Sequence, residues 1–61
     1  MKLRIIRKER GISQKDLATK LGMSQAYLCN LEKGKANVSL HTLRRLAKAL
    51  KVRVADLLAD E

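Results

Sequence analysis

Five short or flexible side chains would line one side of a helix if residues 25–33 are helical: Gln25, Ala26, Cys29, Asn30 and Lys33. At about 100° per residue they share an outer arc of roughly 140°, while Tyr27, Leu28 and Leu31 point to the other side. Glutamine and asparagine amides can form paired hydrogen bonds with adenine, and alanine can rest on a thymine methyl group. This chemistry suits the DNA major groove. The alternative is an ordinary solvated face, but such faces prefer Glu and Lys to short uncharged residues.

Other chemistry has little support among the residues present. The chain contains a single cysteine, Cys29, and a single histidine, His41, so it can form neither an intrachain disulfide nor a Cys/His zinc site. Ser39, His41 and Asp56 fall on separate or rotated helical positions and make no credible catalytic triad. We therefore expect no enzyme activity, no metal, no cofactor and no small-molecule effector site. Cys29 is interpreted as a small residue in place of serine, with a redox switch as the alternative.

The charge balance indicates an anionic partner. The chain has 61 residues, 14 Lys plus Arg, six Asp plus Glu and a formal net charge of +8. Residues 1–35 hold nine of the basic and three of the acidic residues, so positive charge concentrates in the half that carries the outer arc. With one Tyr and no Phe or Trp, the chain lacks the aromatic platforms that stack single-stranded bases, which favours duplex DNA. An anionic lipid surface, bound by a membrane-surface helix, is the competing explanation.

Size and hydropathy bound the architecture. Residues 1–61 are expected to form one domain. No apolar run approaches the roughly 20 residues that span a bilayer, and no signal-peptide core follows Met1, so we expect a soluble cytoplasmic protein without membrane contact. A chain this short buries only roughly 60% of its unfolded surface, which makes self-association the expected support of its stability.

A repeated residue pattern predicts where helices begin and end. An apolar residue, a serine and, four positions after the serine, a leucine recur as Ile12-Ser13-Leu17, Met23-Ser24-Leu28 and Val38-Ser39-Leu43. Each serine predicts an N-cap worth about 1 kcal/mol, and each apolar pair a hydrophobic staple. Glycines at 11, 22 and 34 predict helix ends. The sequence thus predicts an all-α fold with helices near residues 2–10, 14–21, 25–33, 40–50 and 54–59.

Helical periodicity also predicts the core. The inward residues are Leu3, Ile6, Leu17, Ala18, Leu21, Leu28, Leu31, Leu40, Leu43, Leu46, Ala47, Leu50, Val54, Leu57 and Leu58. Only Gly22, Met23 and Ser24 separate the second and third helices, so these two helices must cross at a steep angle. Ala18 supplies the small side chain that such a crossing needs, and Gly22 the positive φ.

The segment from Gln14 to Lys33, QKDLATKLGMSQAYLCNLEK, resembles the helix-turn-helix of the lambda-repressor and Cro family, also called the XRE family. The similarity continues through Leu31-Glu32-Lys33-Gly34-Lys35 and Leu46-Ala47-Lys48-Ala49-Leu50, and covers essentially the whole chain. It implies a compact five-helix, lambda-repressor-like domain with the helix-turn-helix at helices two and three. Val38 replaces a frequent proline, Lys51 a helix-ending glycine and Arg53 a Ser, Thr or Asp cap.

The resemblance implies roles for individual residues. The position of Gln25 reads a base in the family, and that of Gln14 holds a phosphate and steadies the reader. With the outer arc, this gives Gln25, Ala26, Cys29 and Asn30 as base readers, and Gln14, Ser24, Tyr27, Lys33, Lys35, Asn37 and Ser39 as phosphate contacts. Tyr27 is alternatively only a residue at the rim of the core. Arg7 and Glu32 match the family's structural ion pair. The basic residues Lys2, Arg4, Lys8, Arg44, Arg45 and Lys48 are expected only to be solvated.

We therefore predict a sequence-specific, double-stranded DNA-binding regulator of transcription, with repression the expected mode. It would bind a pseudo-palindromic operator as a homodimer, associated with the nucleoid of a prokaryote or with a phage. Val54, Leu57 and Leu58 form the expected dimer interface, with one leucine at the two-fold axis and the other in the core. The alternative is a protein-interaction module, such as an antitoxin or a bridging cofactor, whose helix-turn-helix docks another protein.

Overall fold

A computed structural model describes residues 1–59, and in this range the backbone forms five helices and no strand. The helices are α1 (Leu3–Glu9), α2 (Gln14–Leu21), α3 (Gln25–Glu32), α4 (Leu40–Leu50) and α5 (Val54–Leu58). The all-α prediction is confirmed, and the helix ends agree with the predicted ones to within one residue. The predicted domain also includes residues 60 and 61, which lie outside the described residues.

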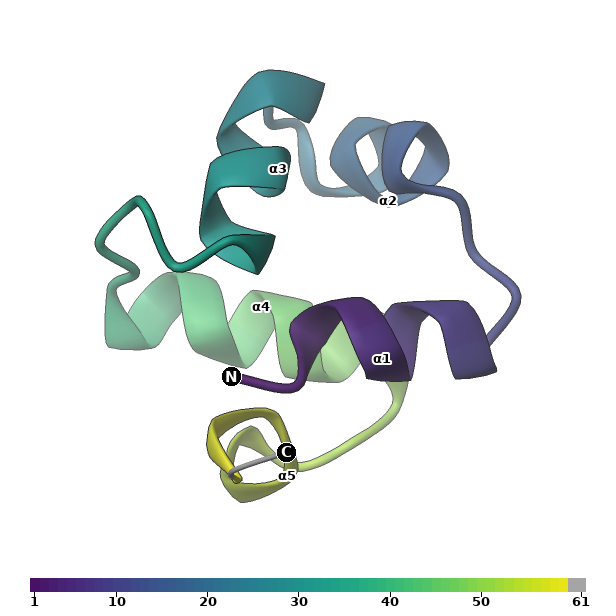
Figure 1. The fold of residues 1–61 in the computed structure, drawn as a ribbon. Coiled ribbons are helices and arrows are strands. Elements are labelled where there is room, and N and C mark those ends of the chain that lie inside the picture. Colours follow the sequence, from purple (N-terminus) through teal and green to yellow (C-terminus); the bar gives the residue numbers. More distant parts are fainter. Residues whose placement is uncertain (60–61) are drawn as a thin grey trace.

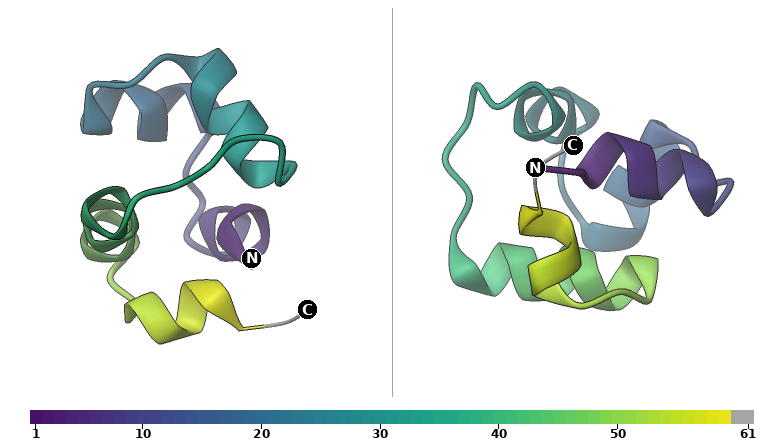
Figure 2. Two further views of the ribbon diagram at one scale, coloured as in Figure 1. Left: turned by 90° about the vertical axis from the view of Figure 1, so that its left-hand side faces the viewer. Right: turned by 60° about the horizontal axis from the view of Figure 1, so that its bottom comes forward.

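The helices are arranged in three levels. α1 and α4 lie side by side, with the α2 and α3 pair on one side of them and α5 on the other (Figure 1). The same order is visible after a quarter turn of the molecule (Figure 2). The chain start lies against α5, where the Lys2 amide donates a 2.7 Å hydrogen bond to the Leu57 carbonyl oxygen. The start of the chain therefore contacts α5 on the side away from the helix-turn-helix (Figure 1).

Three of the helices begin as their serines predict. The hydroxyl oxygens accept hydrogen bonds from amides of the first helical turn: Ser13 from Asp16 at 3.0 Å, Ser24 from Tyr27 at 3.0 Å and Ser39 from Thr42 at 3.1 Å. Each cap satisfies one of the amides that a helix start leaves without a partner. The apolar residue before each serine is half-buried and packs against the core, namely Ile12, Met23 and Val38. Local sequence therefore sets where α2, α3 and α4 begin.

All five helices contribute to one core. Every buried apolar residue among those described belongs to the predicted set: Leu3, Ile6, Leu17, Ala18, Leu21, Leu28, Leu31, Leu43, Leu46, Ala47, Leu50 and Leu57. The prediction for Leu40 is wrong, since this residue is 55% exposed. It lies in the first turn of α4, which extends past the start of α1 (Figure 1). The inward placement of Leu58 is also wrong, because neighbouring residues of a helix point about 100° apart and Leu57 takes the inward direction. Val54 is half-buried.

The corner between α2 and α3 is closed by backbone hydrogen bonds. Gly22 adopts a left-handed conformation with φ 66°, and its amide donates to the Thr19 carbonyl, while the Met23 amide donates to Ala18. The guanidinium of Arg45 donates to the carbonyl of Leu21 at the end of α2. The expectation that Arg45 is merely solvated is therefore wrong, because it caps α2 from α4.

The junction between α4 and α5 is built from less favourable residues. Lys51 ends α4 with φ 59°, a left-handed conformation that a side chain other than glycine adopts at a cost. Arg53 offers no acceptor to the first turn of α5. Instead the Asp56 carboxylate accepts from the Arg53 amide at 3.0 Å and from its guanidinium at 3.3 Å. The hydrogen bond from the Arg53 amide lowers the pKa of Asp56 below its usual value, and the Arg53 guanidinium lowers this pKa further.

Candidate nucleic-acid interface

The two sides of α3 differ as predicted. Leu28 and Leu31 are buried in the core, whereas Gln25, Ala26, Asn30 and Lys33 are exposed and Cys29 is half-buried at the margin of the outer arc. The outer arc is thus an open surface of small, polar and basic side chains. Four of its five members face solvent freely, and Cys29 does so in part.

Tyr27 lies between the two sides. The residue is 36% exposed, and its hydroxyl donates a 3.4 Å hydrogen bond to the Asn37 carbonyl oxygen in the loop after α3. This contact joins α3 to the loop, as a residue at the rim of the core would. The hydroxyl oxygen still has acceptor capacity, but a phosphate contact would need its single proton.

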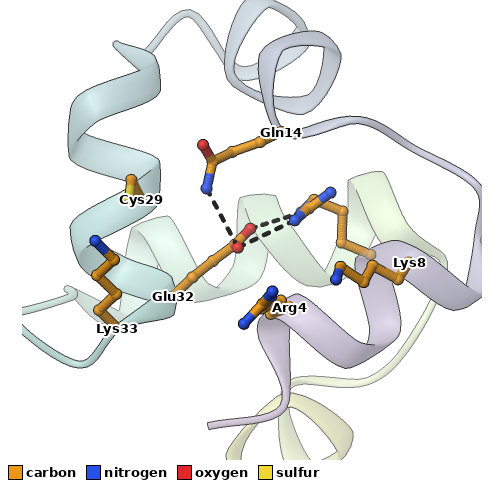
Figure 3. Close-up of a pocket in the computed structure, with 7 residues that line it drawn as sticks. Arg4, Lys8, Gln14, Cys29, Glu32 and Lys33 are labelled. Atoms are coloured by element: carbon orange, nitrogen blue, oxygen red, sulfur yellow. Dashed lines mark hydrogen bonds and ion pairs between the residues drawn. The ribbon is translucent and has the colours of Figure 1, made fainter.

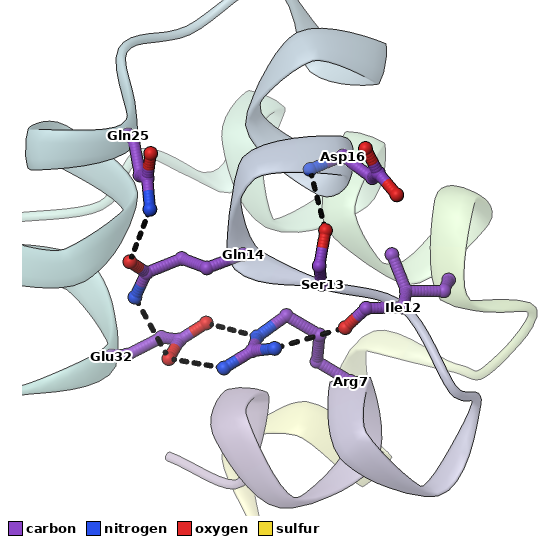
Figure 4. Close-up of polar contacts among 7 residues, drawn as sticks. All are labelled: Arg7, Ile12, Ser13, Gln14, Asp16, Gln25 and Glu32. Carbon is purple, nitrogen blue, oxygen red and sulfur yellow. Dashed lines mark hydrogen bonds and ion pairs between the residues drawn. The ribbon is translucent and has the colours of Figure 1, made fainter.

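A chain of hydrogen bonds connects the outer arc to α1 (Figure 4). The Gln25 amide donates to Gln14 Oε1 at 3.3 Å, and the Gln14 amide donates to Glu32 Oε1, also at 3.3 Å. Arg7 Nε then donates to Glu32 Oε2 at 2.6 Å, and Arg7 Nη2 to Glu32 Oε1 at 3.2 Å. We call these four residues the polar relay. It ties α1, α2 and α3 together at the surface that carries Gln25.

The inner end of the polar relay is buried and fully hydrogen-bonded. The side chains of Arg7 and Glu32 are only 9% and 5% exposed, and Arg7 Nη1 also donates to the Ile12 carbonyl at 2.9 Å. A bidentate guanidinium and carboxylate pair has a fixed geometry, and burial keeps water from competing for it. The structure therefore brings Arg7 and Glu32 into the predicted contact, and this pair fixes where Gln14 is held.

The outer end of the polar relay leaves a specific set of groups free on Gln25. An amide has two N–H donors and one carbonyl oxygen, and the contact with Gln14 uses one donor. One N–H and the oxygen remain for a ligand. Adenine presents the complementary acceptor and donor, N7 and the N6 amino group, in the major groove. Gln25 is thus held in a state that suits paired hydrogen bonds with an adenine edge.

The predicted phosphate contacts lie around the outer arc. Lys33, Lys35 and Asn37 follow α3 and are exposed. Ser24 and Ser39 use their hydroxyl oxygens as caps, and the Ser39 hydroxyl also donates to Thr42 Oγ1 at 3.0 Å. The Ser39 hydroxyl proton is therefore already used. A phosphate near Ser39 would be bound by backbone amides at the start of α4 instead.

Sequence reasoning missed two residues near this surface. A cleft of about 420 Å³ between α1 and α3 is lined by Arg4, Arg7, Lys8, Gln14, Cys29, Glu32 and Lys33 (Figure 3). Arg4 and Lys8 were expected only to be solvated, yet they stand one turn apart beside the outer arc. Their spacing of four residues was the signal in the sequence, but it gains meaning only once α3 is placed next to α1.

Two further observations limit the chemistry of the described residues. Within residues 1–59, no group of three or more His, Cys, Asp or Glu side chains is arranged to hold a metal ion. No helix in this range is long and apolar enough to cross a membrane.

Comparison with known proteins agrees with this arrangement. The helix-turn-helix family profile matches residues 3–57. The HTH-type transcriptional regulator DdrOP3 of Deinococcus deserti is 46% identical over 57 residues, which cover 93% of this chain and 44% of that protein. The immunity repressor protein of Bacillus phage phi105 is 38% identical over 60 residues, which cover 98% of this chain and 42% of that protein. The control protein C.MunI of a Mycoplasma species is 33% identical over 60 residues, which cover 97% of this chain and 81% of that protein.

The five-helix fold is that of a helix-turn-helix domain, and the relatives that it matches are named as transcriptional regulators or repressors. With the match over residues 3–57, the chain belongs to the helix-turn-helix family, in its XRE or lambda-repressor-like branch. It spans less than half the length of the first two relatives.

Proposed function

We propose that this domain binds a specific duplex DNA sequence through the outer arc of α3 and represses transcription as a homodimer. The observation that carries the proposal is the polar relay, which holds the Gln25 amide with one N–H and its oxygen free on an exposed surface. A fixed reader loses little side-chain entropy when it binds, which favours discrimination between bases. The repressor name of the phage relative supports repression as the mode of action.

The base contacts would be divided along the outer arc. Gln25 takes an adenine edge, Asn30 a second base one turn further on, and Ala26 a thymine methyl group between them. Cys29 is half-buried, so it would contact only the edge of the groove. Each well-formed amide pair discriminates by about 1–3 kcal/mol against the wrong base.

Backbone contacts would hold α3 in the groove. Lys33, Lys35 and Asn37 are exposed along the loop after α3, and Gln14 and Ser39 mark the starts of α2 and α4. Free amides at a helix start attract phosphate through the helix dipole. These contacts carry no sequence information but fix the register of the reading residues. The protein would accordingly act on DNA in the cytoplasm of a prokaryote or of a phage-infected cell.

The proposed dimer interface lies on α5. Leu58 is 54% exposed and Val54 is half-buried, whereas Leu57 is fully buried and has no surface left for a partner. The expectation for Leu57 is therefore corrected: it belongs to the core, and Leu58 takes the two-fold axis. Half-sites one DNA turn apart place each recognition helix about 17 Å from that axis. A protomer that measures 24 × 24 × 19 Å, with α5 and α3 on different sides, is compatible with this distance.

Selection from random duplexes tests the proposal. We expect an enriched pseudo-palindrome whose affinity falls by orders of magnitude between about 50 and 200 mM salt. Lys35→Ala should weaken binding to all sequences alike and reduce the salt slope by about one per subunit. Lys48→Ala, which removes one charge from the far part of α4, is the matched control and should leave the slope unchanged. No enriched sequence, together with a salt-insensitive protein partner, would favour a protein-interaction module instead.

A further inference from the structure

The cleft between α1 and α3 has a charge that the fold does not neutralise. Four cationic side chains line it, those of Arg4, Arg7, Lys8 and Lys33, against the single carboxylate of Glu32. Both Glu32 oxygens already accept hydrogen bonds from Arg7, and one of them also accepts from Gln14. Within residues 1–59, Arg4, Lys8 and Lys33 take part in no ion pair. Three positive charges therefore face this cleft uncompensated.

The side chains are arranged around the opening rather than scattered. Arg4 and Lys8 stand on the α1 side of the Glu32 carboxylate, and Cys29 and Lys33 on the α3 side (Figure 3). Both Cys29 and Lys33 belong to the outer arc. The cleft thus opens directly beside the surface that is proposed to read bases.

The dimensions of DNA indicate which ligand the cleft could bind. A helix with its side chains is about 10–12 Å across, and the major groove is about 12 Å wide. A helix seated in the groove therefore has a phosphate backbone along each of its sides. The loop that follows α3 and carries Lys35 and Asn37 lies on one side of α3, and α1 lies on the other side (Figure 1, Figure 2). With α3 seated in the groove, the loop would face one strand and α1 the other.

From this geometry we infer that the α1–α3 cleft binds a phosphate of the second DNA strand through Arg4, Lys8 and Lys33. Arg7 is a positioning residue here, because its guanidinium is committed to Glu32 and Ile12. The inference rests on the proposed function and assigns a binding role to Arg4 and Lys8, which otherwise have none. The same chemistry would also suit a free phosphate ion, so the experiment must separate the two sources.

The test compares two double variants with equal loss of charge. Arg4→Gln with Lys8→Gln removes the α1 cations, and Arg44→Gln with Lys48→Gln removes an equally spaced pair of exposed cations from α4. Binding to a mixed-sequence duplex is measured as a function of salt. The α1 variant should lower the salt slope by about one per protomer, whereas the α4 variant should retain the slope of the wild type. Equal slopes for the α1 variant and the wild type would overturn the inference.

Cys29 supplies a second readout, because it is the single cysteine and lines the cleft. Its alkylation by neutral iodoacetamide is followed with the duplex or with inorganic phosphate. We expect the duplex to slow alkylation and phosphate to have little effect at millimolar concentration. Protection by inorganic phosphate in the wild type but not in the α1 variant, with equal salt slopes, would mean a free-anion site and overturn the DNA-strand assignment.

The design also separates this inference from the proposed function. A wild type that binds no duplex at any salt concentration would contradict both the proposed function and the cleft assignment. A wild type that binds a selected sequence, with an α1 variant that matches it in slope and affinity, ends the cleft assignment alone. Circular dichroism of each variant confirms that these exposed substitutions leave the fold intact.

Discussion

The helix-turn-helix, residues 14–32, and the α4–α5 end, residues 50–58, begin and end their helices by different means. In the helix-turn-helix, serine hydroxyls cap α2 and α3, and Gly22 takes the left-handed conformation between them. At the α4–α5 end, Lys51 takes that conformation and Arg53 starts α5 with the help of Asp56. The residues at the helix ends of the helix-turn-helix favour the backbone conformations found there, whereas those of the α4–α5 end do not.

Side-chain contacts follow the same division. The polar relay ties the helix-turn-helix to α1 through buried groups, while α5 is held mainly by Leu57 and leaves Leu58 exposed. A base reader needs a fixed position, because a small displacement loses its paired hydrogen bonds. A dimerisation helix can gain its remaining packing from the partner. The difference suggests that the helix-turn-helix is built to be complete within one chain and the α4–α5 end to be completed by a second.

Removing one member of the buried ion pair should have the largest effect on stability. Arg7→Met or Glu32→Gln alone leaves the other group buried without its partner, and we expect a loss of about 3–5 kcal/mol. Urea unfolding measures it, with trimethylamine N-oxide added to keep the variants folded before the transition. In a double-mutant cycle the second substitution should cost far less than the first. Strictly additive losses would show that the two residues do not stabilise each other.

Leu58→Lys should break the α4–α5 end as an interface without unfolding the chain. Two lysines at a two-fold axis repel each other and replace apolar contact, so we expect a folded monomer with much weaker operator binding. Leu40→Lys is the matched control, since Leu40 is equally exposed but lies on another part of the surface. Sedimentation at tens of micromolar is the measurement. A wild type that is monomeric both with and without operator would end the dimer model.

Substituting the left-handed residue of each region, Lys51 and Gly22, sharpens the comparison of the helix ends. Lys51→Gly relieves the positive φ and should stabilise the chain by about 1 kcal/mol, and Gly22→Ala should destabilise it by about the same amount. A Cβ at Gly22 would meet no atom within 4 Å, so its effect comes from the backbone conformation rather than from a clash. Thermal unfolding of both variants checks the signs. A destabilising Lys51→Gly would show that the lysine side chain matters more than its backbone strain.

The smallest expected effect is that of pH on α5. The pKa of Asp56 is lowered in the folded chain, so its contribution is present above the usual value of 3.8 and disappears as pH falls through the lower folded pKa. The difference in unfolding temperature between wild type and Asp56→Asn should therefore narrow over the interval from about pH 5 to below the usual pKa of 3.8. A difference that stays constant over this interval would exclude the Arg53 and Asp56 contact as its source.

Most of the fold could be predicted from the sequence because its signals are local. Serine caps, glycine ends and helical periodicity depend on residues a few positions apart, which is why Ser13, Ser24 and the buried leucines were placed correctly. Leu40 was misplaced because periodicity gives a direction around the helix but does not show whether another helix covers that end.

The candidate site was predictable only in part, for the same reason. The outer arc follows from the helical period of α3 alone. The resemblance suggested the contacts of Gln14 with Gln25 and of Arg7 with Glu32, but residues 11 and 25 positions apart cannot be paired from spacing. The role of Arg45 at the end of α2 depends on how the helices pack and has no local signal in the sequence. The spacing of Arg4 and Lys8 is visible in the sequence, but it points to a cleft only once α3 is placed next to α1.

We propose above all that Gln25, held by the polar relay, reads one base of each half-site. The most direct test of this claim is selection from random duplexes with wild type, Gln25→Ala and, as a control for general affinity, Lys35→Ala. We predict that Gln25→Ala loses the preference at one half-site position by about 1–3 kcal/mol and that Lys35→Ala keeps the wild-type preference at every position. A Gln25→Ala variant that selects the same bases as the wild type with the same discrimination would contradict the claim.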